Sequence, residues 1–233
     1  MQHSSWCRVE DVRVSTQVRV ALLIAGAFVI AIGGLLFWAG RDDAAEPGSD
    51  APGGAADPRL VREDSRIMGE EGSSDVVLVE FLDFECEACG AAYPIIEQLR
   101  EEYAGEVTFV ARYFPLPGHF NSERAARAVE SAARQGKFEE MYQRMFETQS
   151  SWGEQQEPLD DLFREYAVEI GLDMDQYDAD YASDEVADRV QRDVADGTDL
   201  GVQGTPTFYL NGELFEPTSA EDFNTAIDDA LNQ

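Results

Sequence analysis

The stretch Val76-Val77-Leu78-Val79-Glu80-Phe81-Leu82-Asp83-Phe84-Glu85-Cys86-Glu87-Ala88-Cys89 decides the fold. Its apolar, β-branched first half predicts a strand buried on both faces. The strand breaks at residues 83–85, and residues 90–103 carry apolar side chains at helical spacing. Cys86 and Cys89 therefore fall at a strand-to-helix turn, on the first turn of the helix. Unpaired backbone N–H groups and the positive end of the helix dipole stabilise a thiolate at such a position.

The rest of the folded part alternates strands and helices. Residues 107–114 predict a second central strand, and the helix between the two strands implies that they are parallel, with a right-handed crossover. A short edge strand is expected within residues 60–68. A long helical block is predicted over residues 121–200. The C-terminal part is expected to hold a strand, a type I′ turn, a second strand and a capped helix, at residues 204–210, 211–212, 213–215 and 219–231.

The first 58 residues predict three segments without a place in that fold. Residues 20–40 hold no charged residue, and their length spans roughly 30 Å, so they are expected to form a transmembrane anchor. The excess of arginine in residues 1–19 predicts a cytoplasmic tail and an extracytoplasmic catalytic domain. Residues 41–58 predict a disordered linker, which leaves residues 59–233 as the folded domain. A cleaved signal peptide is the competing interpretation of the apolar segment.

The charge of the chain restricts its partners. Acidic residues number 47 against 17 Lys and Arg, a net charge of −30. Phosphates would be repelled, so no nucleic-acid partner is expected. A solvated acidic surface, as in proteins adapted to salt, is the simplest interpretation, and an acidic patch for one basic partner is the alternative.

Three chemical roles are open to the vicinal cysteines. A disulfide between Cys86 and Cys89 closes a very short loop and would stabilise the fold by only about 2 kcal/mol, so a structural role is weak. A closed zinc site needs four ligands. Cys7 and His3 precede the predicted anchor, which leaves only His119 on the same side as the pair. Redox chemistry is therefore predicted, with the Cys86–Cys89 disulfide in place of a cofactor and with no metal.

The order of these motifs resembles the DsbA-like thiol–disulfide oxidoreductases, whose α/β thioredoxin-like fold carries an inserted helical subdomain. The resemblance covers roughly residues 59–232. It rests on the Cys-x-x-Cys turn and on phrases at residues 80–84, 115–119, 135–138 and 201–208, the last of which contains Gly204-Thr205-Pro206.

The resemblance also implies roles for single residues. Cys86 matches the exposed nucleophile and Cys89 the buried resolving cysteine. Pro206 matches the proline that is cis in this family, and Thr205 would offer backbone groups to an extended substrate chain. Glu80, six residues before Cys86, matches a buried acid that relays a proton to or from Cys89; a strand residue facing water is the alternative.

The dipeptide Glu87-Ala88 between the cysteines differs from the Pro-His of the most oxidising relatives. Carboxylates at Glu85 and Glu87 oppose thiolate formation at Cys86, whereas the helix dipole favours it. We expect the pKa of Cys86 to be lowered, but less than in strong oxidants; if both carboxylates are solvent-screened they have little effect. His119, in a Pro-Gly loop, is expected to fix that loop rather than to take part in catalysis.

The function expected from the resemblance is formation or exchange of disulfides in exported proteins that contain cysteine. A membrane redox partner, quinone-linked in this family, would re-oxidise the pair. Two alternatives remain open: a reductant for cytochrome or copper-site assembly, and a non-catalytic thiol-dependent chaperone or metallochaperone. The direction of electron flow, the substrates and the oligomeric state are not fixed by the sequence.

Overall fold

A computed structural model describes residues 57–233 of the chain. The predicted cytoplasmic tail, the membrane anchor at residues 20–40 and nearly all of the predicted linker lie outside the described residues. Within residues 57–233, no helix combines the length and the apolar character needed to cross a bilayer.

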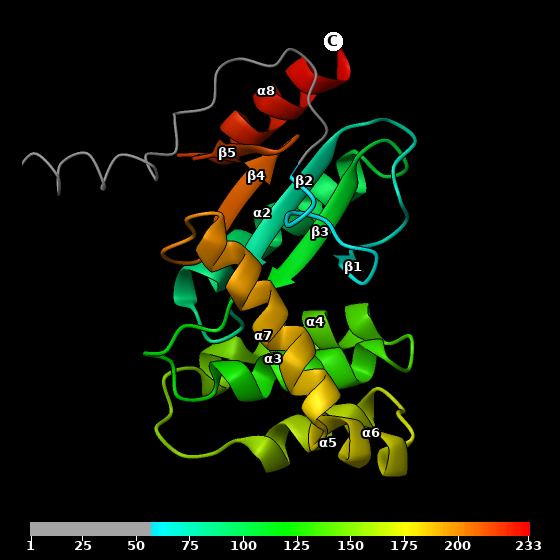
Figure 1. Ribbon diagram of the computed structural model, residues 1–233, viewed down its shortest axis with the longest axis vertical. Coiled ribbons are helices and arrows are strands. Elements are labelled where there is room, and N and C mark those ends of the chain that lie inside the picture. The colour runs from blue at the N-terminus through cyan, green and yellow to red at the C-terminus, as the bar shows by residue number, and fades with distance from the viewer. Residues whose placement is uncertain (1–56) are drawn as a thin grey trace, which may run out of the picture. The chain divides into compact units, whose positions relative to one another are not determined.

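A five-stranded sheet forms the centre of this part of the chain (Figure 1), in the order β1-β3-β2-β4-β5. Strand β2 (Val77–Leu82) pairs parallel with β3 (Thr108–Tyr113) and antiparallel with β4 (Thr207–Leu210). The first strand is therefore central and buried on both faces, as predicted. The expected edge strand is shorter than residues 60–68, because β1 holds only Arg66–Ile67.

The C-terminal prediction is confirmed, except that the strand expected at residues 204–210 begins at Thr207. Strand β5 (Glu213–Phe215) pairs antiparallel with β4, and both Asn211 and Gly212 have positive φ, as a type I′ turn requires. Helix α8 (Ala220–Leu231) begins with a capping box between Ser219 and Asp222. The hairpin and the helix thus extend the sheet and cover it.

Helices lie on both faces of the sheet. One face packs against α2 (Glu87–Glu102) and α8, whose Ile96, Leu99 and Ile227 join Leu78 and Leu82 of β2 in the larger core cluster. The other face packs Val79 and Phe81 of β2 against Leu60, Val202 and Val194, the last of which lies on α7 (Asp184–Asp199). Because successive strand residues point to opposite faces, Glu80 lies on the same side as α2.

Five helices separate β3 from β4 and form a block at one end of the sheet (Figure 1). They are α3 (Ser122–Ala133), α4 (Phe138–Trp152), α5 (Asp160–Glu169), α6 (Met174–Tyr181) and α7 (Asp184–Asp199). Helix α7 returns the chain from this block to β4 and contacts the sheet through Gly197. A Cβ atom placed there would lie 2.8 Å from the Phe114 ring, so only glycine permits this approach.

A buried cluster of charges joins the first described residues to this framework. The Arg112 guanidinium, on β3, is fully buried and bonds the carboxylates of Asp193 and Asp196 on α7 at 2.7 and 2.6 Å. It also donates to the backbone carbonyls of Arg59 and Leu60. A buried arginine is tolerated because each of these acceptors offsets its loss of hydration.

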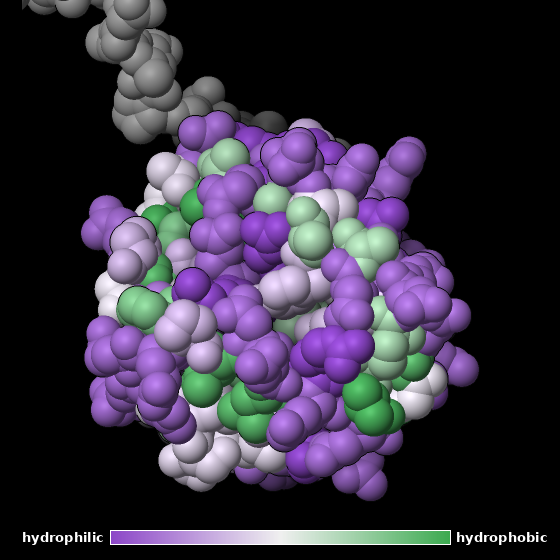
Figure 2. All heavy atoms as spheres, turned by 90° about the horizontal axis from the view of Figure 1, so that it is seen from below, coloured by the Kyte–Doolittle hydropathy of each residue, from purple (hydrophilic) through white to green (hydrophobic). Residues whose placement is uncertain are grey.

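The surface of the helical block is polar. Seen from below, it is mostly hydrophilic, with apolar residues scattered singly or in small groups (Figure 2). Among the described residues, the large apolar side chains that are most exposed are Val61, Phe120, Val168 and Leu214.

Candidate functional site

The two cysteines lie at the N-terminus of α2, with Cys86 as the N-cap residue and Cys89 in the first turn. The helix starts at Glu87, so the predicted position of the cysteines on its first turn is confirmed. The apolar periodicity begins only at residue 90, because the side chains of Glu87 and Ala88 are exposed. Both cysteines are free thiols in this structure.

Burial distinguishes the two sulfurs. Cys86 keeps 8% of its surface exposed, whereas Cys89 keeps none. The Cys86 sulfur lies 3.3 Å from the carbonyl oxygen of Thr205, and the Cys89 sulfur lies 3.5 Å from the backbone N–H of Asp83. Cys86 is therefore the outer thiol and Cys89 the inner one, as the resemblance implies.

The electrostatics of the pair are unequal. A hydrogen bond from Cys89 lowers the pKa of Cys86 to about 5; Thr205 and backbone N–H groups of Ala88 and Cys89 act in the same direction, against burial. Burial, followed by the same hydrogen bond and the negative charges on Glu80 and Cys86, raises the pKa of Cys89 well above its ordinary value. At neutral pH the outer sulfur is thus a thiolate and the inner one a thiol.

The loop before β4 brings Thr205 and Pro206 to this pair. The Thr205–Pro206 peptide bond is cis, as expected from the resemblance. The hydroxyl oxygen of Thr205 is buried and has no hydrogen-bond partner among the described residues. It is one of the groups that lower the pKa of Cys86, so it is available to donate to the thiolate. The sequence predicted backbone contacts from Thr205 but not this use of its side chain.

Glu80 lies beneath the pair, inside the core. The residue is only 3% exposed, and its Oε2 atom has no partner among the described residues. Burial, with smaller effects of the charges on Cys86 and Glu97, raises its pKa to about 8. The water-facing alternative for Glu80 is therefore wrong, and its carboxyl group holds a proton at neutral pH.

The acidic residues that flank Cys86 differ from each other. Glu87 and Ala88 are exposed, whereas Glu85 is buried, with its Oε2 accepting from the N–H of Asn121 at 2.6 Å. The expectation of solvent screening thus fits Glu87 only. The groups that shift the pKa of Cys86 most do not include either glutamate.

Asp83 is a site residue for which the sequence predicted no role. Its carboxylate is buried and accepts hydrogen bonds from the backbone of Glu85 and Leu116 at 2.9 Å, while His119 Nδ1 lies 2.6 Å from Oδ2. The ring of His119 thus fixes its loop against the cysteine turn, in agreement with the predicted structural role. Burial alone would lower the pKa of His119, but the Asp83 carboxylate outweighs it and raises that pKa. The sequence feature that could have indicated a site role for Asp83 is its position directly after the apolar strand.

A second contact that the sequence did not predict comes from Gln149 in the helical block. Its side-chain amide donates to the carbonyl oxygens of Phe84 and Cys86, both at 2.8 Å. No local pattern marks this residue, because it lies 63 positions after Cys86.

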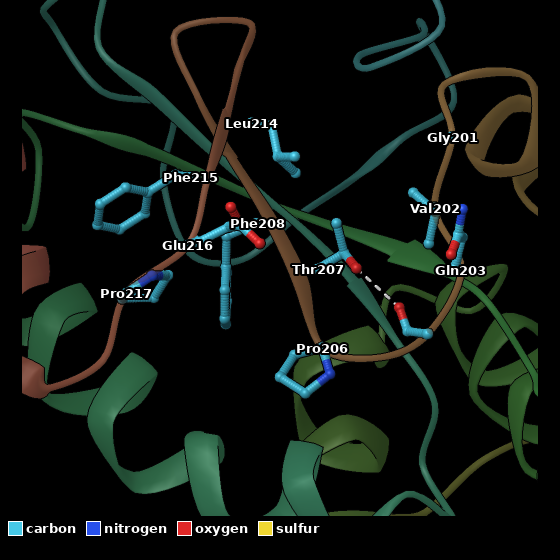
Figure 3. Close-up of a pocket in the computed structure, with 11 residues that line it drawn as sticks. Gly201, Val202, Gln203, Pro206, Thr207, Phe208, Leu214, Phe215, Glu216 and Pro217 are labelled. Carbon is cyan, nitrogen blue, oxygen red and sulfur yellow. Dashed lines mark hydrogen bonds between the residues drawn. The ribbon is translucent and has the colours of Figure 1, made fainter.

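A cavity of about 530 Å³ opens beside Pro206 (Figure 3). Its walls are the loop before β4, the two strands of the C-terminal hairpin and the segment after them, including Val202, Phe208 and Leu214. A hydrogen bond of 2.7 Å from the Thr207 hydroxyl to the carbonyl of Gly204 holds the loop in shape. Apolar side chains and the backbone of the loop before β4 line the cavity together, which suits an extended peptide segment.

Comparisons with known proteins place the chain among thioredoxin-like proteins. A family model described as thioredoxin matches residues 62–229. A thioredoxin-like oxidoreductase from Silicibacter pomeroyi DSS-3 is 27% identical, with a TM-score of 0.64 over 76% of this chain and 98% of that one. The disulfide-exchange protein α-DsbA2 of Wolbachia pipientis is 22% identical, with a TM-score of 0.64 over 74% and 90% of the two chains. BdbD from Bacillus subtilis has a TM-score of 0.65 at 20% identity, over 79% and 100%.

Curated relatives carry a different name. The Na(+)/H(+) antiporter NhaA 1 of Mycobacterium sp. (strain KMS) is 35% identical over 214 residues, which cover 88% of this chain and 32% of that protein. The Na(+)/H(+) antiporter NhaA of Herminiimonas arsenicoxydans is 34% identical over 200 residues, 84% and 30% of the two chains. The chain spans about a third of the length of these relatives.

Proposed function

The chain belongs to the thioredoxin family, among its DsbA-like thiol–disulfide oxidoreductases, and we propose that it forms or exchanges disulfides in exported proteins through Cys86 and Cys89. The observation that carries this proposal is the division between the two sulfurs. The outer one is stabilised as a thiolate, and the inner one is kept as a thiol. A thiolate that leaves easily, next to a thiol that can resolve a mixed disulfide, is what exchange requires.

The proposed reaction begins with the Cys86–Cys89 disulfide. A substrate thiolate attacks the sulfur of Cys86, which forms a mixed disulfide and releases Cys89 as a thiolate. Cys89 takes up a proton, for which we assign the buried carboxyl group of Glu80 as the donor. A second substrate thiolate then attacks the substrate sulfur of the mixed disulfide and releases Cys86. The substrate gains one disulfide, and the protein is reduced by two electrons to its dithiol form.

Whether the protein acts as an oxidase or as a reductant depends on how stable its dithiol form is relative to its disulfide form. A group that stabilises the Cys86 thiolate also stabilises the reduced protein, and a stabilised reduced form makes a stronger oxidant. The lowered pKa of Cys86 therefore supports an oxidase over a reductant. The exposed dipeptide Glu87-Ala88 is proposed to tune this potential only weakly. No bound cofactor is needed, since the disulfide itself carries the electrons.

The substrate and the cellular setting belong to the proposal as well. We assign Thr205 and Pro206 to the binding of an extended substrate segment, with the cavity beside Pro206 available for its side chains. An uncleaved anchor at residues 20–40 would hold the domain outside the cytoplasmic membrane, close to a membrane partner, quinone-linked in this family, that re-oxidises it. The curated relatives, of which the chain matches about a third, are named as Na(+)/H(+) antiporters, and transport of ions is a membrane activity that agrees with this proposal.

The redox equilibrium of the full chain tests the function. With Cys7→Ala, so that only one pair can react, the protein is equilibrated in glutathione buffers and the dithiol fraction is measured by alkylation. A potential above about −180 mV is expected for an oxidase. A value near about −270 mV, as in thioredoxin, would favour a reductant. No reversible two-electron step would leave only the chaperone alternative.

A further inference from the structure

Gln149 on α4 makes the side-chain hydrogen bonds that join this helix to the backbone of the redox turn. Its Nε2 atom lies 2.8 Å from the carbonyl oxygens of both Phe84 and Cys86. These carbonyls lie on either side of Glu85, at the point where the strand becomes the helix. Since both partners can only accept, the orientation of the Gln149 amide is fixed, with its nitrogen toward the turn.

Gly90 makes room for this contact. It occupies the first turn of α2, and its N–H donates to the carbonyl of Cys86 at 3.0 Å. A Cβ atom placed on Gly90 would lie 2.0 Å from Oε1 and 2.8 Å from Cδ of Gln149. Glycine inside a helix is unfavourable by roughly 1 kcal/mol relative to alanine, so its presence here needs a reason, and the approach of Gln149 supplies one.

We propose that Gln149 is a positioning residue of the redox site, which holds the first turn of α2 so that its backbone N–H groups stay directed at the Cys86 sulfur. The inference rests on the proposed function and deepens it, because it assigns to the inserted helical block a part in setting the properties of Cys86. Gly90 is the second residue of this arrangement, because its missing side chain leaves the space that the Gln149 amide occupies.

The physical argument concerns the orientation of peptide groups. In a trans peptide the C=O and the following N–H point in opposite directions, so a bond that fixes the Cys86 carbonyl also fixes the N–H of Glu87. The N–H groups of Ala88 and Cys89 lie in the same turn and stabilise the thiolate. The Cys86 carbonyl already accepts from the Gly90 N–H, so Gln149 adds a second bond that ties this terminal turn, which is prone to fraying, to α4. Without Gln149, the N–H groups would therefore spend less time directed at the sulfur.

The test uses the full chain with Cys7→Ala, and it measures the pH dependence of Cys86 alkylation together with the glutathione equilibrium. In Gln149→Ala, we expect the pKa of Cys86 to rise by about one unit, and the dithiol–disulfide equilibrium to shift about tenfold toward the disulfide, which corresponds to about 30 mV. Gln149→Glu should have a larger effect, because a carboxylate, besides lacking the donor, places a negative charge against the two carbonyl oxygens and near the Cys86 thiolate. Gln143→Ala is the matched control: this glutamine lies on the same helix, is similarly half-buried, and contacts Glu97 instead.

Gly90→Ala tests the same contact from the other side. Its methyl group must displace the Gln149 amide, so it should change the Cys86 titration as Gln149→Ala does. The double variant Gly90→Ala with Gln149→Ala should match either single variant and not show the sum of their effects. In the Gln149→Ala background the added alanine should raise the melting temperature, because the clash is absent and only helix propensity remains.

The outcomes separate this inference from the proposed function. If the parent protein shows a reversible two-electron step but Gln149→Ala and Gly90→Ala both titrate like Gln143→Ala, the role of Gln149 is refuted and the function stands. If the parent protein shows no such step, the proposed function fails, and the Cys86 titration still decides whether Gln149 acts on the sulfur. If the two substitutions shift the Cys86 titration additively in the double variant, the inference that Gly90 and Gln149 act through one contact would also be refuted.

Discussion

The sulfur of Cys86 lies 3.3 Å from the carbonyl oxygen of Thr205, a residue 119 positions later in the chain. The outer sulfur and the backbone carbonyl that contacts it therefore come from opposite halves of the thioredoxin-like fold. Thr205 also carries a buried hydroxyl without a partner among the described residues. The thiol can thus donate to the Thr205 carbonyl, and the thiolate can accept from its hydroxyl. This pair of interactions suits a sulfur that changes its protonation state during the reaction.

Removal of that hydroxyl is the first prediction. The rate of Cys86 alkylation in the reduced protein should rise with pH around a midpoint of about 5. In Thr205→Val, which keeps the shape and the carbonyl, the midpoint should move upward by up to about one unit, because one donor to the thiolate is lost. A parent midpoint near about 8.5, the value of an unperturbed cysteine, would contradict the account of the site.

The two cysteines should differ in what their loss does. Cys86→Ser should abolish disulfide exchange, because no outer thiolate remains. Cys89→Ser should trap a mixed disulfide with a substrate peptide, because the inner resolving thiol is missing. Non-reducing gel electrophoresis distinguishes the two, and mass spectrometry identifies the sulfur that is bonded. A stable adduct on Cys89 in the Cys86→Ser variant would reverse the assigned roles.

Glu80 should make stability depend on pH. Its pKa is raised by burial to about 8 in the folded protein, against 4.5 for an unperturbed carboxyl group. The contribution of the neutral carboxyl to stability is therefore complete below about pH 4.5 and is lost as pH rises to about 8. In the oxidised protein, the stability gain of Glu80→Gln over the parent should grow as pH rises through this range and reach at least about 2 kcal/mol near pH 8, since each unit of pKa shift corresponds to about 1.4 kcal/mol.

Urea unfolding at several pH values checks this prediction, and the use of the oxidised protein removes the titration of the cysteines. A constant difference between Glu80→Gln and the parent would mean that the pKa of Glu80 is not raised. If Glu80 is also the proton donor, the variant should release Cys89 more slowly from the disulfide, which stopped-flow measurement of the exchange step would detect.

The buried guanidinium of Arg112 should be important for folding. Arg112→Ala would remove one of the two arginine partners of the buried Asp193 carboxylate, which Arg189 would still pair at 2.6 Å, so the loss in urea unfolding should lie at the lower end for a broken buried pair, about 3 kcal/mol. Arg164→Ala is the control, because its ion pair with Asp178 is about half-exposed and should contribute no more than about 1 kcal/mol. Equal effects of the two substitutions would show that burial does not set the strength of the Arg112 cluster.

Salt should stabilise the protein. A net charge of −30 implies strong repulsion within the folded chain. Between about 0.05 M and about 1 M NaCl the screening length falls to about 3 Å, so the repulsion should weaken and the melting temperature should rise. Calorimetry at both concentrations measures it. A melting temperature that falls with salt would indicate that ion pairs outweigh the net repulsion.

Much of this fold was predictable because its signals are local. The run from Val77 to Leu82 marks a buried strand, the Asn211-Gly212 dipeptide marks a hairpin, and Ser219 with Asp222 marks a helix start. The first turn of α2 was predicted from the position of the cysteines, because the exposed side chains of Glu87 and Ala88 add nothing to the apolar periodicity that begins at residue 90.

The contacts of the site were less predictable because they join distant parts of the chain. Cys86 and Cys89 stand out by their spacing, but nothing near Gln149 indicates that it bonds their turn. Asp83 and His119 were both visible in the sequence, and only the fold brings them within 2.6 Å. The position of Glu80 beneath the cysteines depended on family resemblance, because a carboxyl group in a strand can face either core or water.

The Arg112 cluster also has a mechanical meaning. Arg112 holds the carbonyls of Arg59 and Leu60 and ties them through Asp193 and Asp196 to α7. Tension applied to the chain ahead of Asp57 would be transmitted to β3 and α7 by this ionic clamp. None of its side chains bonds the cysteine turn. A domain pulled from its N-terminal side would therefore bear the load on a part of the fold separate from the reacting sulfurs.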